Sequence, residues 1–262
     1  MKDVSIMAAT TKRTTATRLS LAALFAVLGG CATVTNPSPQ DPLEGFNRTM
    51  FTVNDKFDQI ALKPIATAYR KFLPSFVQTG VHNFFSNIGD VWDSANGYMQ
   101  GNGTDGTTSL VRFTMNSTLG LGGLIDFASQ AGLQKKDKDF GQTLGIWGVG
   151  SGPYLVLPLF GPSNIRDAAA LPVDIYADPW SYKYPVRWRN TGTVVRLVDK
   201  RANLLDATDL IDQIALDKYQ FVRDAYIQRR QSQIDGPAKD DGDSSAPAEK
   251  AAPADVTPKT PQ

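Results

Sequence analysis

Two residue types that carry much of protein chemistry are almost missing from this chain of 262 residues, which has one cysteine, Cys31, and one histidine, His82. A single thiol excludes an internal disulfide framework and any zinc site built from several thiolates. With no second histidine and no cysteine partner, His82 cannot form a metal site or a Cys-His catalytic pair. The sequence therefore predicts no bound metal.

The chain also lacks an excess of charge of one sign. It carries 27 Lys and Arg against 26 Asp and Glu, a formal net charge of +1, and the two signs are interspersed. Because nucleic-acid binding requires a basic patch or stripe, this pattern predicts no binding of nucleic acid. With 42% hydrophobic residues, the chain can still bury a core.

Long hydrophobic runs are absent as well. No apolar run reaches about 18 residues, so no segment is expected to span a bilayer alone. The apolar segment at about residues 19–28 follows Lys12, Arg13 and Arg18. Its length of roughly ten residues is that of a signal-peptide core, which predicts a targeting segment.

The sequence LGGC, residues 28–31, comes directly after this segment and resembles the bacterial lipoprotein box. The resemblance implies that residues 1–30 are a lipoprotein signal peptide, cleaved between Gly30 and Cys31. Cys31 would then be the lipid anchor, carrying covalent N-acyl and S-diacylglycerol lipid and no other cofactor. Ala32 in the next position implies sorting to the outer membrane. The alternative is an ordinary signal peptide followed by an incidental buried cysteine.

Both ends of the expected mature chain have the composition of tethers. Residues 31–40 are rich in Pro, Ser and Thr, which predicts an extended leash between the lipid and the fold. Residues 236–262 hold one bulky apolar residue, Val256, among Ala, Pro and Asp. Such a tail buries too little apolar surface to offset the conformational entropy lost on ordering, so it is predicted to be disordered. The folded unit is expected to span residues 41–235.

Apolar residues recur at steps of three and four over most of the folded unit, which predicts helices. Spacing does not distinguish a stripe that packs in a soluble core, the usual case, from one that faces lipid. No strand pair is evident, so the expected fold class is all-α. The first helix is expected to start with Asp41 as N-cap and Pro42 at its first position. Further helices are predicted after Pro64, over residues 77–98, after Ser163 or Asn164, over residues 187–205 and over residues 207–234.

Two stretches depart from plain helical spacing. Residues 112–133 read as two helical pieces joined at Gly120, Gly122 and Gly123, where the backbone bends at low cost. This pattern predicts a hairpin or a hinge. Residues 140–162 are rich in glycine and carry a proline within an apolar run. Because proline argues against a central strand, a buried extended segment is expected there.

Two stretches come close to a catalytic or a dinucleotide-binding motif, but neither meets the requirements of its motif. A Ser-His-Asp hydrolase would need G-x-S-x-G, but residues 148–153 read GVGSGP and place Val149 where the first glycine is required. Residues 101–106 fit G-x-G-x-x-G, yet they follow a predicted helix rather than a strand, which indicates a loop and not a dinucleotide site. No enzymatic activity is predicted.

Three long motifs resemble the VacJ family, also called MlaA: DPLEGFNRTMF at residues 41–51, GLGGLIDFA at 120–128 and FGQTLGIWGVGSGPYLVLPLFGPSNIRD at 140–167. The similarity covers nearly the whole folded unit. Members of this family are lipoproteins that maintain the lipid asymmetry of the outer membrane. The resemblance implies amphipathic helices arranged as a ring in the inner leaflet, around an amphipathic central channel that removes misplaced phospholipids from the outer leaflet.

The resemblance also implies partners and a location. The partners would be membrane phospholipid, a periplasmic lipid-binding shuttle that serves an inner-membrane transporter, and a trimeric porin. The chain would be lipid-anchored on the periplasmic leaflet of the outer membrane. The competing interpretation is an envelope-anchored scaffold or adhesion lipoprotein that binds a porin without moving lipid.

A first candidate segment for lipid traffic is the glycine cluster at Gly120, Gly122 and Gly123. A gate needs a segment that changes shape at low cost, so these residues are candidates for a hinge that controls the channel. The alternative is a fixed tight turn between packed helices.

A second candidate comprises Glu44, Gly45, Phe46, Asn47 and Arg48. The resemblance implies that this stretch opens a helix bordering the ring and lies where the chain enters its membrane-facing part. Ordinary capping and core packing is the alternative.

An aromatic group is the third feature. Amphipathic rings sit well at a membrane interface, although a porin contact or plain packing would use them equally. The group consists of Trp180, Tyr182, Tyr184 and Trp188.

Overall fold

The computed structural model describes residues 41–236; the predicted signal peptide, Cys31 with its lipid, the leash and the tail lie outside the described residues. The described part is helical apart from one two-stranded sheet, so the predicted helical fold class is confirmed. The elements in chain order are α2 (Glu44–Phe57), the π-helix η1 (Asp58–Leu62), α3 (Lys63–Phe72), α4 (Ser75–Met99), α5 (Gly103–Thr118), α6 (Phe127–Gln130), α7 (Phe140–Ile146), β1 (Tyr154–Leu157), β2 (Gly161–Asn164), α8 (Ile165–Ala177), the 3-10 helix η2 (Pro179–Tyr182), α9 (Val186–Asn203), α10 (Leu205–Ile214) and α11 (Lys218–Asp235).

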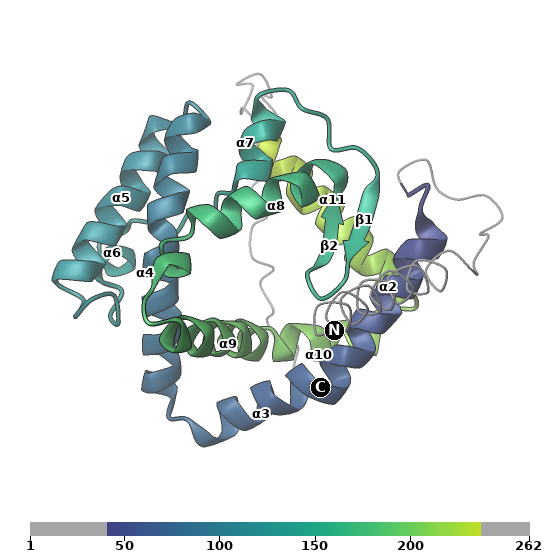
Figure 1. Ribbon diagram of the computed structural model, residues 1–262, viewed down its shortest axis with the longest axis horizontal. Helices are drawn as coiled ribbons and strands as arrows, with labels where there is room; N and C mark the ends of the chain where they lie inside the picture. The colour runs from purple at the N-terminus through teal and green to yellow at the C-terminus, as the bar shows by residue number, and fades with distance from the viewer. Residues whose placement is uncertain (1–40, 237–262) are drawn as a thin grey trace, which may run out of the picture.

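The elements are arranged as a ring. In Figure 1, α4, α9, α10, α2, the β1–β2 sheet and α8 surround an open area in the ribbon. The helices α5 and α6 form a lobe on the outer side of α4, and α5 packs along α4. On the other side of the molecule α11 packs on α7 and on β2, so the last helix joins the two strands to the rest of the ring.

Polar and apolar side chains are distributed in an unusual way. Among the described residues, buried polar or charged residues outnumber buried hydrophobic ones, and large hydrophobic side chains lie exposed on every long helix. A water-soluble domain shows the opposite preference in its interior and rarely exposes contiguous apolar patches. The hydrophobic core is correspondingly small. Its buried members form two clusters, Met50, Tyr154, Val156 and Tyr219 in one and Ala66, Ala202 and Leu205 in the other.

The first helix starts later than the sequence predicts. It begins at Glu44, with Leu43 at the N-cap and no side-chain hydrogen bond to the cap. Asp41, the predicted N-cap, is fully buried instead and accepts hydrogen bonds from Asn47 Nδ2 at 2.8 Å and from the Tyr219 hydroxyl. The N-cap prediction was wrong because Asp41 is held by a tertiary contact that local spacing does not encode.

The apolar stripe of α2 and η1 is buried at one end only. Met50 is 5% exposed and belongs to the core, whereas Val53, Phe57 and Ile60 are 50%, 44% and 79% exposed. One continuous stripe therefore meets two environments, the small core and the surface of the ring.

The strands β1 and β2 form an antiparallel hairpin with Tyr154 opposite Asn164. The expectation of an extended segment without strand pairing was wrong. Pro158 lies in the turn between the strands, where it interrupts no ladder hydrogen bond, so it does not argue against the strands themselves. Leu159 in this turn and Gly161, the first residue of β2, have positive φ values of 65° and 82°.

The single C-terminal helix predicted over residues 207–234 is two helices. α10 ends at Ile214 and α11 begins at Lys218. Asp217 caps α11, because its side chain accepts a hydrogen bond from the Gln220 backbone N–H at 3.1 Å. The apolar row continues across this break, which is why spacing alone indicated one helix.

The other helices lie close to their predicted positions. The helix predicted over residues 77–98 is α4, and the one predicted over residues 187–205 is α9. Asn164 caps α8 as expected, accepting a hydrogen bond from the Asp167 backbone N–H at 2.9 Å.

Candidate functional site

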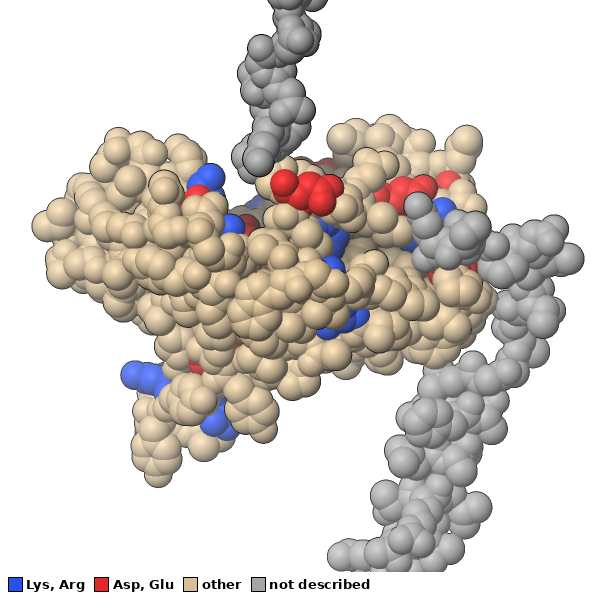
Figure 2. Space-filling view, turned by 90° about the horizontal axis from the view of Figure 1, so that it is seen from above, with Lys and Arg blue, Asp and Glu red and all other residues tan. Residues whose placement is uncertain are grey.

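The lobe of α5, α6 and the turn between them is almost free of charge. Between residues 106 and 134 the ionisable side chains are Arg112 and Asp126, and they pair with each other, Arg112 Nη2 lying 3.0 Å from Asp126 Oδ2. Figure 2 shows this lobe, at the left of the view, as a surface made almost entirely of uncharged residues. We call it the apolar lobe. Its exposed large hydrophobic residues are Leu110, Val111, Leu119, Leu121, Leu124, Ile125 and Phe127.

Arg112 fixes the apolar lobe from the inside. Its guanidinium is buried, donates to Ser129 Oγ at 2.9 Å and also donates to the Leu133 carbonyl. Burial acts to raise the pKa of Asp126, but hydrogen bonds from Ser129, Asn116 and Arg112 lower it to about 2. The pair therefore stays ionised beneath an apolar surface, and it holds the end of α5 to α6.

A second cluster of buried charges joins α4 to the segment before α7. Lys135 Nζ lies 2.6 Å from Asp90 Oδ1 and 2.5 Å from Asp93 Oδ2. Asp93 also accepts a hydrogen bond from the Lys138 backbone N–H at 3.0 Å. Burial raises the pKa of Asp93 to about 6 although Lys135 acts to lower it, and burial raises the pKa of Asp90 as well. Two carboxyl groups thus share one ammonium group inside the ring wall.

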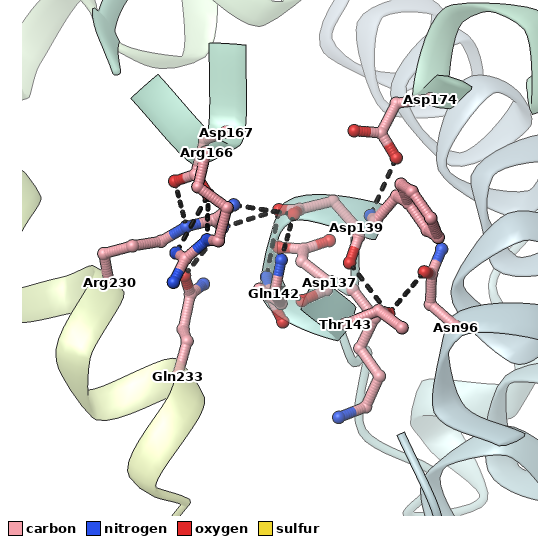
Figure 3. A network of polar contacts seen from close by, with 12 residues as sticks. Asn96, Asp137, Asp139, Gln142, Thr143, Arg166, Asp167, Asp174, Arg230 and Gln233 are labelled. Carbon is pink, nitrogen blue, oxygen red and sulfur yellow. Dashed lines mark hydrogen bonds and ion pairs between the residues drawn. The ribbon is translucent and has the colours of Figure 1, made fainter. Parts of the chain in front are cut away.

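A third network connects α7, α8 and α11 (Figure 3). Arg230 on α11 donates from Nε to Asp167 Oδ2 at 2.6 Å and from both terminal nitrogens to Asp139, each at 2.6 Å. The Tyr226 hydroxyl donates to Asp167 at 2.6 Å. Burial acts to raise the pKa of Asp167, but the hydrogen bonds from Arg230 and Tyr226 lower it overall. This arginine therefore holds the last helix onto the ring.

Further hydrogen bonds extend the same junction to α4. Thr143 Oγ1 donates to Asn96 Oδ1 at 2.7 Å, and both residues are fully buried (Figure 3). Asp174 Oδ1 accepts from Trp92 Nε1 and from the Phe140 backbone N–H, each at 2.8 Å. The helices of this part of the ring are thus held together by polar contacts more than by apolar packing.

In the predicted segment of Glu44, Gly45, Phe46, Asn47 and Arg48, Glu44 and Asn47 are buried and the other three residues are partly buried. Asn47 donates to the Tyr154 carbonyl at 3.0 Å and accepts from the Val156 backbone N–H at 2.8 Å, which ties α2 to β1.

The contacts of the neighbouring side chains agree with this placement. Arg48 pairs with Glu44 and with Asp217, each at 2.8 Å, and Phe46 packs against the core cluster of Met50. These contacts include core packing, one part of the alternative considered for this segment, but no side-chain cap.

The three predicted hinge glycines form a tight turn after α5. Gly122 and Gly123 have φ values of +72° and +94°, and the Gly123 N–H donates to the Asn116 carbonyl at 2.8 Å. A Cβ on Gly123 would lie 2.6 Å from Asn87 Nδ2, and one on Gly120 would lie 2.1 Å from the Ile125 carbonyl oxygen. Glycine is therefore required by close packing and by backbone conformation.

His82 lies at the junction of α3, α4 and α9. Its Nδ1 is 3.1 Å from Asp199 Oδ2, and this hydrogen bond raises the pKa of the imidazole although burial acts against it. The Tyr69 hydroxyl donates to the other oxygen of Asp199 at 3.1 Å. Over residues 41–236 no three His, Cys, Asp or Glu side chains are placed to hold a metal ion.

Sequence reasoning missed the ionic networks. Arg230 and Lys135 lie in a helix and in a loop, and no local sequence pattern marks either of them. Asp139 precedes Gln142 by three residues, the spacing of an N-cap, and its side chain does accept from the Gln142 backbone N–H at 2.8 Å. That spacing could have located the start of α7, but not the arginine 91 positions away that binds the same carboxylate.

Known proteins resemble this chain both in sequence and in fold. A profile of the MlaA lipoprotein family matches residues 39–233 of the chain. This chain belongs to the MlaA lipoprotein family. The "Intermembrane phospholipid transport system lipoprotein MlaA" of Escherichia coli strain K12 is 37% identical over 223 residues, which cover 81% of this chain and 86% of that protein. The protein of the same name from Haemophilus influenzae is 32% identical over 234 residues, 83% of this chain and 91% of that protein.

A solved structure extends the match to three dimensions. It was reported as "Structural basis for maintenance of bacterial outer membrane lipid asymmetry", and it superposes with a TM-score of 0.65 at 38% identity. The match covers 74% of this chain and 98% of the solved chain. The resemblance to the MlaA family found in the sequence is therefore confirmed, and the relatives are named as components of a transport system.

Proposed function

We propose that this MlaA family member removes phospholipids that are misplaced in the outer leaflet of the outer membrane, through an amphipathic channel in the ring. It passes them to a periplasmic lipid-binding shuttle of an inner-membrane transport system. Support comes from relatives named for intermembrane phospholipid transport and from a solved relative reported for outer membrane lipid asymmetry. The proposal involves movement of lipid only; no bond is made or broken.

The observation that carries the proposal is the reversed distribution of side chains. The helices of the ring meet through buried polar residues such as Asp90, Asn96 and Arg112, while many large apolar side chains are exposed. Exposed apolar surface of this extent is stable where acyl chains solvate it. A ring with polar contacts inside and apolar flanks outside provides separate surroundings for the headgroup and the tails of a phospholipid.

The proposed position in the membrane is the periplasmic leaflet. No helix among residues 41–236 is both long enough and apolar enough to cross a bilayer. In the proposal, residues 1–30 are removed and the lipid on Cys31 anchors the chain. Residues 31–40 act as the leash, residues 41–235 form the helical domain in the leaflet, and residues 236–262 are a disordered tail. A trimeric porin is the proposed neighbour within the membrane.

The turn at Gly120, Gly122 and Gly123 is proposed to control the channel, and it can be tested by pinning it to α4. A Cβ on Gly80 would lie 3.7 Å from Leu124 Cδ2, so the pair Gly80→Cys and Leu124→Cys places two thiols at the point of contact. Formation of the disulfide is expected to stop lipid removal, and reduction to restore it. Unchanged lipid removal in the oxidised protein would leave the turn as a fixed connection.

The function itself is tested in cells that lack the gene. We expect phospholipid to accumulate at the cell surface and the cells to become sensitive to detergent, with both changes reversed by the full-length chain. A scaffold that binds a porin without moving lipid predicts neither change, so normal surface lipid in these cells would exclude transport.

A further inference from the structure

A groove of about 470 Å³ lies where α4 crosses α9, away from the ionic networks of the ring wall. Apolar side chains dominate its lining, with Leu124 of the apolar lobe at one side. Its volume falls in the range of roughly 300–1,000 Å³ that small-molecule sites occupy. The lining residues that matter here are Phe84, Phe85, Trp180, Lys183, Trp188 and Val195.

The floor of the groove is held in place by aromatic contacts. The Trp180 ring packs edge-on against Phe84 and Phe85, with ring centroids 6.0 Å and 5.2 Å apart, and its Nε1 donates to the Arg189 carbonyl at 3.0 Å. A Cβ on Gly192 would lie 2.1 Å from the Trp180 ring, so glycine at this point of α9 allows the indole to lie flat on the helix. The groove is therefore formed before any ligand binds.

One unpaired cation, Lys183, lies at the rim. The Lys183 ammonium makes no hydrogen bond or ion pair with any residue in the range 41–236, and no carboxylate lines the groove. Arg187 lies close to another lining residue, Trp188, with its guanidinium carbon 5.5 Å from the centre of that ring. The nearest acidic residue along the chain, Asp178, is already paired with Arg196. A cation at the edge of an apolar groove complements a ligand with an anionic group and an apolar chain.

The surrounding surface fits a membrane interface. Tyr182, Tyr184 and Trp188 are 72%, 82% and 56% exposed, and Lys183 and Arg187 stand among them. Aromatic residues with a polar end, interspersed with Lys and Arg, are typical of the level of the lipid headgroups. Lipid headgroup phosphates are thus the anions that this rim would meet.

We infer that the groove between α4 and α9 is a phospholipid-binding site in which one acyl chain lies on Trp180 and Val195 and the phosphate contacts Lys183. The class of ligand, a phospholipid, rests on the proposed function. The inference adds a defined site for that lipid on the ring wall. Binding here would hold one lipid by its phosphate while its tails remain in the leaflet.

The test uses the full-length lipoprotein in vesicles that contain phosphatidylglycerol with a photoreactive diazirine near the end of one acyl chain. Irradiation is expected to label the segment around Val195, as located by mass spectrometry of peptides. Val195→Trp fills the groove and is expected to lower this labelling about tenfold. Val194→Trp is the matched control, because Val194 is 60% exposed and does not line the groove.

A second variant removes the cation without filling the groove. Lys183→Gln is expected to weaken labelling by about tenfold, the effect of losing one charge-assisted contact, and Lys183→Arg to retain it. Because Lys183 is exposed, neither change should affect folding. Equal labelling of the wild type, Val195→Trp and Lys183→Gln would overturn the site.

The groove could instead receive an apolar segment of a partner protein. A photoreactive residue placed at Thr191 in cells would then cross-link to protein rather than to lipid, which would also overturn the site. Failure of the proposed function is read out separately, as normal surface phospholipid in cells that lack the gene. Labelling of the groove by vesicle lipid does not depend on that result.

Discussion

At the scale of single residues, a few buried polar side chains join elements that are far apart in the sequence. Asn47 is the clearest case: it is 0% exposed and bonds to Asp41 and to two backbone groups of β1. A buried amide that satisfies three partners leaves all three unsatisfied when it is removed. Such a residue fixes one arrangement of its neighbours more strictly than an apolar contact does.

Asn47→Ala is therefore expected to lower the free energy of unfolding by about 2–4 kcal/mol. The measurement is thermal or urea-induced unfolding in detergent solution. Asn190→Ala serves as the control, since Asn190 is exposed and should change stability by about 0.5 kcal/mol or less. Equal stability of the two variants would contradict the structural role given to Asn47.

Gly122 and Gly123 offer a matched pair. Both have positive φ, so alanine at either position carries backbone strain of about 1 kcal/mol. A Cβ on Gly122 would meet no atom within 4 Å, whereas one on Gly123 would meet Asn87. We expect Gly123→Ala to be about 2 kcal/mol less stable than Gly122→Ala in the same unfolding experiment. Similar losses for both variants would show that Asn87 moves aside easily.

At the scale of elements, ionic contacts hold the helices where apolar packing is thin. Helix α11 has an apolar contact with the core through Tyr219, and near its other end Arg230 binds Asp139 and Asp167. Removing one partner of such a buried network leaves uncompensated charge on the other partners.

Arg230→Met is expected to cost about 3–5 kcal/mol and to expose the amides of α11 and α7 to hydrogen exchange. Arg229→Met is the control, because Arg229 is exposed and adjacent in the chain. Unaltered exchange in α11 of Arg230→Met would refute the role of this arginine in docking the helix.

The buried carboxyl group of Asp93 on α4, next to Lys135, makes the stability of the fold depend on pH. Burial raises the pKa of Asp93 from 3.8 to about 6, so the folded chain keeps a proton that the unfolded chain has lost between about pH 4 and pH 6. This group therefore makes the folded state less stable as pH rises through that interval, by up to about 3 kcal/mol.

Asp93→Asn is expected to flatten the stability profile between pH 4 and pH 6. A slope of the same sign should remain, since burial also raises the pKa of Asp90 and Asp174. Thermal unfolding at several pH values measures this profile. Asp206→Asn is the control and should leave the profile unchanged, because the Asp206 side chain is 84% exposed. A steeper profile in Asp93→Asn would reverse the sign argued here.

At the scale of the whole molecule, the reversed side-chain distribution makes the lipid surroundings part of the stability of the fold. Leu110 is 46% exposed on the apolar lobe. Leu110→Glu should weaken binding of the full-length chain carrying Cys31→Ser to phospholipid vesicles about tenfold, because a carboxylate would have to enter the acyl region. Gln228→Glu on α11 places the same charge on an exposed polar position and should bind as before; flotation with vesicles measures both.

The sequence predicted the elements better than their contacts. The steps of three and four residues located α4 and α9 closely, because a 3.6-residue period is a local property. The hairpin of β1 and β2 was missed because Pro158 was taken as evidence against a strand, whereas it lies in the turn between the two strands.

The site was harder to predict, for a physical reason. The spacing of apolar residues shows which face of a helix is hydrophobic but not whether that face packs in a core or stays exposed. Phe57 and Ile60, which are exposed, could therefore not be told from core residues by the sequence. The partner of Arg230 and the groove at Lys183 depend on residues brought together by the ring, and no local pattern records them.

The first and last helices of the ring complete each other. Asp41 accepts the hydroxyl of Tyr219, 178 positions away, and Arg48 pairs with Asp217. During biosynthesis Asp41 therefore lacks its partner Tyr219, and Arg48 its partner Asp217, until almost the entire polypeptide has been synthesised. Any product that stops short of Asp217 is therefore expected to lack both contacts and to be degraded rather than to accumulate.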